Sequence, residues 1–150
     1  MRVAALQRAP SRAWRALSAR LGRRGAYLFS AGCAWTGYGI GVAIDPRYGT
    51  VRGVTILARY CPLTVFGWLW IVFGLTACVC AFFRTPGRDR VGFGAAVLPA
   101  LLWAGAYGAS WITGDYPKAW TSAISWGFAA IRLMVVSGWR EQDRQETPDE

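Results

Sequence analysis

The sequence predicts an all-α membrane protein, a four-helix transmembrane bundle with an N-terminal basic amphipathic helix. The first observation is an uncharged, apolar stretch at residues 62–83. As a helix it would extend ~33 Å, enough for the ~30 Å hydrocarbon core of a bilayer. The second is composition, since 54% of the residues are hydrophobic and 15% aromatic, and the apolar residues form four blocks. The third is charge, because the cations border these blocks, as membrane-flanking cations do.

Residues 1–25 contain seven arginines and no acidic residue. A helix beginning near Ser11 would separate apolar residues from arginines, which is typical of a helix lying in the headgroup layer. Each basic group near an anionic surface contributes about 1 kcal/mol, so we expect anionic lipid headgroups as partners. The alternatives are a disordered basic tail that only sets topology and a mitochondrial presequence. The predicted membrane-surface residues are Arg12, Arg15, Arg20, Arg23 and Arg24.

The predicted membrane domain covers residues 26–139 and is followed by an acidic cytoplasmic tail at 140–150. Its spans occupy residues 26–44, 62–83, 92–112 and 119–139. The first and third spans are rich in small residues at four-residue spacing, which lets helix backbones approach closely in lipid. This spacing predicts helix contacts within the chain or between copies, a homo-oligomer in the second case. The predicted packing residues are Gly37, Gly41, Ala104, Gly105, Gly108 and Ala109.

Tryptophans divide into two groups along the predicted spans. Trp35 and Trp103 fall near the middle of their spans, so we expect them to pack inside the bundle. Trp111 and Trp120 flank the last turn, as an aromatic belt would. The connector 45–61 mixes apolar and basic residues, and we expect either an interfacial helix or an early extension of the second span.

Orientation follows from the distribution of cations. With both ends on one side, that side holds twelve basic residues and the other side four. We expect the chain to lie in the inner (plasma) membrane of the cell. The positive-inside rule then predicts that both termini are in the cytoplasm.

Arg132 is the only ionisable residue well inside a predicted span. An arginine at the centre of a membrane helix costs about 2.5 to 3.5 kcal/mol on insertion scales, so its presence needs an explanation. One interpretation is that the side chain reaches the nearer interface, close to Gly138. The others are that it faces the bundle or water, with Thr121 and Ser125 as a sparse polar stripe on its face, or that it contacts a partner protein.

The residues offer little for catalysis, and we expect no enzyme, metal or cofactor. There is no histidine, no pair of intramembrane carboxylates and no phosphate-binding glycine loop. Cys33, Cys78 and Cys80 fall inside predicted spans, where thiols pack as small apolar groups. The basic balance follows the membrane flanks, so we expect no nucleic acid partner.

Three segments carry a resemblance to a known class of protein: GAYLFSAGCAWTGYGIGVAIDP, PLTVFGWLWIVFGLTACVCAFF and GFGAAVLPALLWAGAYGASW. With the arginine-rich lead and charged tail, they resemble small four-span membrane proteins of actinobacteria and their phages. Some such phage proteins are suspected holins, so the resemblance implies a holin-like, membrane-permeabilising oligomer. The alternative is a non-enzymatic scaffold or accessory subunit that binds a cytoplasmic protein partner.

Overall fold

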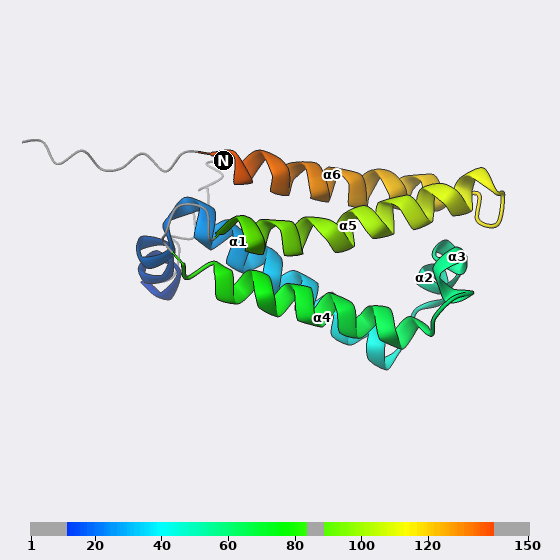
Figure 1. Ribbon diagram of the computed structural model, residues 1–150, viewed down its shortest axis with the longest axis horizontal. Helices are drawn as coiled ribbons and strands as arrows, with labels where there is room; N and C mark the ends of the chain where they lie inside the picture. Colours follow the sequence, from blue (N-terminus) through cyan, green and yellow to red (C-terminus); the bar gives the residue numbers. More distant parts are fainter. Residues whose placement is uncertain (1–11, 84–88, 140–150) are drawn as a thin grey trace, which may run out of the picture.

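The computed structural model describes residues 12–83 and 89–139, without the side chains of 12–19, 48 and 49 (Figure 1). Every element in these ranges is a helix. The order is α1 (Arg12–Ile44), α2 (Tyr48–Gly53), α3 (Thr55–Ala58), α4 (Leu63–Cys80), α5 (Asp89–Ile112) and α6 (Ala119–Ser137). The four long helices run alongside one another; α4 packs against both α1 and α5, and α6 packs on α5 (Figure 1).

Helix α1 is broken at Gly22, where φ is 70° and ψ is 178°. Glycine adopts this conformation without the steric cost that a Cβ would bring. Figure 1 shows the first part of α1, in dark blue, at an angle to the rest and across one end of the bundle. The break lies close to the predicted boundary at residue 25, but the predicted membrane-surface position of this segment stays a prediction. The side chains of Arg12 and Arg15, and the tail at 140–150, lie outside the described part.

Three helices, α4, α5 and α6, are long and apolar enough to cross a membrane. They coincide with the second, third and fourth predicted spans to within three residues at each end. Pro99 lies inside α5, and the helix continues through it, as helices with packed neighbours often do. The first predicted span lies within α1, which is not among these three, so the four-span bundle stays a prediction.

The connector 45–61 forms two short helices rather than an extension of α4. It folds back over one end of the bundle and buries Val54 completely. A Cβ at Gly53 would overlap the Tyr107 ring, and Ser110 Oγ donates a hydrogen bond to the Arg52 carbonyl at 3.2 Å. The connector therefore closes one end of the helix bundle.

An aromatic cluster fills the middle of the bundle, with ring centroids 5.0 to 6.4 Å apart. Trp103 Nε1 donates a hydrogen bond to Tyr38 Oη at 2.8 Å, and Trp35 Nε1 donates to the Ala96 carbonyl at 2.9 Å. Trp103 is fully buried and Trp35 half-buried, which confirms that both pack inside the bundle. The cluster takes members from all four long helices: Trp35, Tyr38, Trp70, Trp103 and Trp126.

Candidate intramembrane groove at Arg132

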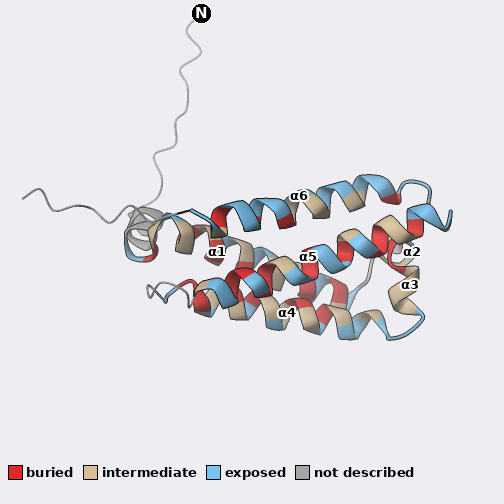
Figure 2. Ribbon diagram, turned by 45° about the horizontal axis from the view of Figure 1, so that its top comes forward, coloured by how far each residue is buried: buried red, intermediate tan, exposed pale blue. Residues whose placement is uncertain are grey.

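Many large apolar residues of α4 and α6 are exposed, and Figure 2 shows exposed positions, in pale blue, along both helices. Trp68 is 60% exposed, Val72 59% and Phe128 60%. Apolar patches of this extent are unfavourable in water, whereas hydrocarbon accommodates them without cost. Together with three helices that are long and apolar enough to cross a membrane, this surface indicates a membrane protein. In that setting the exposed apolar side chains would face lipid, and the remaining polar groups need partners.

The α1 and α4 helices are in backbone contact along the whole of α4. A Cβ at Gly32 would lie 2.7 Å from the Gly74 carbonyl oxygen, and one at Gly39 would lie 2.7 Å from the Gly67 carbonyl oxygen. These distances are too short for any side chain, so glycine is required on both helices. The sequence analysis missed this pair of faces because it searched for small residues four apart, whereas these glycines are seven apart.

The predicted packing glycines occupy a different position. Among the described residues, a Cβ at Gly37 or Gly41 would meet no atom within 4 Å, and the same holds for Gly105 and Gly108. Within the described residues the space beside these glycines is therefore open. Ala104 and Ala109, which lie next to them on α5, are half-buried. Contacts between copies stay a prediction.

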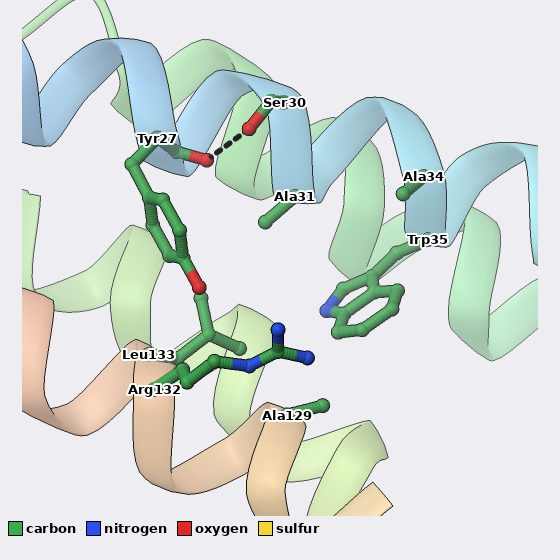
Figure 3. A pocket seen from close by; sticks show the side chains of 8 residues that line it. All are labelled: Tyr27, Ser30, Ala31, Ala34, Trp35, Ala129, Arg132 and Leu133. Carbon is green, nitrogen blue, oxygen red and sulfur yellow. Dashed lines mark hydrogen bonds between the residues drawn. The ribbon is translucent and has the colours of Figure 1, made fainter. Parts of the chain in front are cut away.

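The opposite side of α1 borders a groove shared with α6, with a volume of about 200 Å³ (Figure 3). Few residues of α1 and α6 touch, so the two helices leave this seam open. The α1 wall is formed by Tyr27, Ser30, Ala31, Ala34 and Trp35, and the α6 wall by Ala129, Arg132 and Leu133.

The Arg132 guanidinium lies in this groove. Figure 3 shows the side chain running back along α6 towards Ala129, with its guanidinium between α6 and the α1 wall. This direction leads away from Trp139 and the nearer end of α6, so the conformation is not that of a side chain reaching for that interface. Among residues 12–83 and 89–139, no hydrogen bond, ion pair or ring contact involves Arg132.

Ser30 in the groove, and Thr121 and Ser125 of the predicted polar stripe, each donate a hydrogen bond to a backbone carbonyl of their own helix or its cap. Ser30 Oγ donates to the Tyr27 carbonyl at 2.8 Å (Figure 3). Thr121 Oγ1 donates to the Lys118 carbonyl and Ser125 Oγ to the Thr121 carbonyl, each at 2.9 Å. Thr121 and Ser125 are exposed on α6 and do not line the groove. The hydroxyl oxygens can still accept a hydrogen bond, but none of them supplies a negative charge.

A charged cluster lies at one end of the bundle, where α1, the start of α5 and the residue Trp139 after α6 meet. Arg24 pairs with Asp89 at 2.6 Å, with both side chains 19% exposed. It also donates to the Trp139 carbonyl at 2.8 Å and lies over the Phe93 ring. Arg24 was predicted to face lipid headgroups, but its side chain contacts groups of the protein instead. Arg20 and Arg23 are exposed. The Asp89 contact was missed because the two residues are far apart in the sequence.

Comparisons with protein-family models, with curated proteins and with solved structures found no match. The functional argument therefore depends on the groove and on the helices that form it.

Proposed function

We propose that the chain crosses the inner (plasma) membrane four times, with α1 as a span beside α4 and both termini in the cytoplasm. The support is the length of the α1–α4 contact. A Cβ at Gly25 would lie 2.8 Å from the Ala81 carbonyl oxygen, and one at Gly67 would lie 2.7 Å from Ala43 N. These contacts lie at opposite ends of α4, so a membrane that contains α4 also contains the part of α1 packed on it.

Within this membrane the protein acts as a non-enzymatic accessory subunit, and the groove at Arg132 docks a transmembrane helix that carries a carboxylate. The single observation behind this proposal is the guanidinium without a partner among the described residues, set between two membrane helices. A charge in this position is costly unless it is paired. A carboxylate on the docked helix would supply the missing counter-charge.

The chain itself cannot provide that counter-charge from within the membrane. Its full sequence has eight acidic residues, and five of them fall in 140–150. The other three lie at or beyond helix ends: Asp45, Asp89 and Asp115. A second copy would therefore bring another Arg132 and no acid at its depth. The occupant that fits is a different membrane protein.

Depth argues against a lipid phosphate as the counter-charge. Arg132 lies four residues from the middle of α6, or ~6 Å along the axis, and its side chain points further towards the middle. Headgroups lie roughly 15 Å from the midplane, at the edge of a ~30 Å hydrocarbon core. The groove wall favours a helix instead, because Ala31 and Ala34 on α1 are small enough for a close approach.

Site-specific photo-crosslinking in native membranes tests this proposal. A photoreactive residue at Ala34, on the groove wall, should capture a peptide from a transmembrane segment that contains Asp or Glu. The matched control is the same probe at Val72, exposed on α4, which should capture lipid. Arg132→Leu should abolish capture at Ala34, and Arg132→Lys should retain it. Capture of lipid alone, of a second copy or of a segment without an acid would overturn the proposal, as would capture unaffected by Arg132→Leu.

A holin-like oligomer is the second candidate, and the exposed polar face of α6 favours it. Thr121, Ser125 and Arg132 are all exposed, so copies arranged around a common axis could line a water-filled lumen. Expression in a bacterium should then collapse the membrane potential abruptly, as measured with a voltage-sensitive dye, and Arg132→Leu should weaken the effect. Harmless overexpression would contradict this candidate.

A further inference from the structure

Two cysteine thiols meet across the contact between α1 and α4. Cys33 Sγ lies 3.8 Å from Cys78 Sγ, although the residues are 45 positions apart in the sequence. Cys78 Sγ is also 3.7 Å from the Phe29 carbonyl oxygen on α1. The Cys78 side chain therefore points from α4 onto α1, towards Cys33.

The backbones of α1 and α4 are in contact at this level. A Cβ at Gly32, the neighbour of Cys33, would lie 2.7 Å from Cys78 Sγ and 2.8 Å from Cys78 N. A disulfide needs its two sulfurs ~2.05 Å apart and its Cβ atoms about 3.5 to 4.5 Å apart. The distance of 3.8 Å between the two Sγ atoms is thus ~1.8 Å longer than a disulfide bond. Side-chain rotation can shorten it by this amount because the two helix backbones are already in contact here.

We propose that Cys33 and Cys78 form an intramolecular disulfide between α1 and α4 under oxidising conditions, with dioxygen as the electron acceptor. Each thiol loses its proton, a bond forms between the two Sγ atoms, and two electrons leave. Dioxygen takes up the two electrons and two protons and becomes hydrogen peroxide. Dioxygen is apolar and enters the hydrocarbon layer, where Cys33 is exposed on the surface of α1.

The other two cysteines serve as internal controls because the fold sets them apart. Cys80 is buried, and a Cβ at Gly92 would meet its Cβ at 2.5 Å, so it faces α5 rather than α1. Cys61 precedes α4, at the opposite end of that helix from Cys78. A disulfide at Cys33–Cys78 would covalently attach α1, one wall of the Arg132 groove, to α4, but this inference does not depend on any partner in the groove.

The test uses the full chain carrying Cys61→Ser, in lipid nanodiscs, with dissolved dioxygen and a copper–phenanthroline catalyst. The sample is then unfolded, alkylated with a maleimide and weighed intact. The expected result is a fall from three maleimide adducts to one, reversed by a reducing agent, in a monomeric protein. Adding Cys33→Ser should leave both remaining thiols, Cys78 and Cys80, free to react.

Two results would overturn the proposal. One is the persistence of three adducts after oxidation, in a sample whose circular dichroism shows the helical fold. The other is a disulfide of different connectivity, seen as a covalent dimer that survives Cys78→Ser or as loss of both adducts in the Cys33→Ser variant. Peptide mapping of the oxidised monomer must return the Cys33 and Cys78 peptides joined to each other.

Discussion

Glycines on the two sides of α1 have different surroundings. Towards α4, Gly32 and Gly39 are in backbone contact with their neighbours, with less than 3 Å available for a Cβ. On the rest of its surface, a Cβ at Gly37 or Gly41 would meet no atom of residues 12–83 and 89–139 within 4 Å, and the seam towards α6 stays open as the Arg132 groove. The side towards α4 is fully packed against that helix, whereas the side towards α6 has space for another helix. A small residue in a membrane helix therefore permits a close contact, but its sequence spacing does not tell which neighbour makes it.

The largest effect should come from filling the closed side. In Gly74→Val the new Cβ would lie 2.6 Å from Thr36 N and 2.7 Å from the Gly32 carbonyl oxygen, so the helices must separate. We expect a loss of roughly 3 kcal/mol in the free energy of unfolding, the upper range for overpacking. The measurement is tryptophan fluorescence during denaturation by SDS in mixed micelles. Gly37→Val is the matched control and should change the value by less than about 0.5 kcal/mol; equal losses would contradict the comparison.

The next effect concerns the ion pair that ties α1 to α5 and α6. Arg24→Leu removes both the Asp89 contact and the hydrogen bond to the Trp139 carbonyl. Because hydrogen bonds to charged groups contribute about 1.5 to 3 kcal/mol, we expect a loss of about 2 kcal/mol in the same assay. Arg90→Leu, at an exposed position on α5, should have little effect. A double-mutant cycle of Arg24→Leu with Asp89→Asn that shows no coupling would refute this assignment.

A smaller loss should follow from removing one hydroxyl inside the aromatic cluster. Tyr38→Phe leaves Trp103 Nε1, on a fully buried side chain, without its acceptor. An unsatisfied buried donor costs about 1 to 3 kcal/mol, and we expect the lower end because the ring itself remains. Tyr60→Phe alters a side chain that is 83% exposed and should be neutral. If both variants unfold alike, the hydrogen bond contributes nothing to stability.

The smallest effect tests the predicted contacts between copies on α5. The Cβ added by Gly105→Ala would meet no atom within 4 Å in the described part of the chain, so the better helix propensity of alanine should raise stability by about 0.5 to 1 kcal/mol. Analytical ultracentrifugation in detergent shows whether association changes with it. A protein that loses stability or dissociates on this substitution would have a contact between copies at Gly105.

The sequence allowed a good prediction of the helices but only half of the site. Uninterrupted apolar blocks predicted α4, α5 and α6 almost to their ends, and the cost of a charge in lipid singled out Arg132. The groove wall on α1 could not be read in the same way, because it depends on which side of α1 faces α4. That choice is made by glycines seven residues apart, such as Gly32 and Gly39, together with their counterparts on α4. The Arg24–Asp89 pair likewise exists only once three helices have come together.

The most direct test of the account is the depth of α1 in a bilayer. A spin label at Gly37, in a variant whose four cysteines are serine, is compared with one at Val72 on α4 and one at Asp115 in the last turn. If α1 spans the membrane beside α4, dioxygen will relax the labels at Gly37 and Val72 alike, and a water-soluble nickel chelate will reach only the label at Asp115. Equal access of the nickel chelate to Gly37 and Asp115 would place α1 in water and contradict the account.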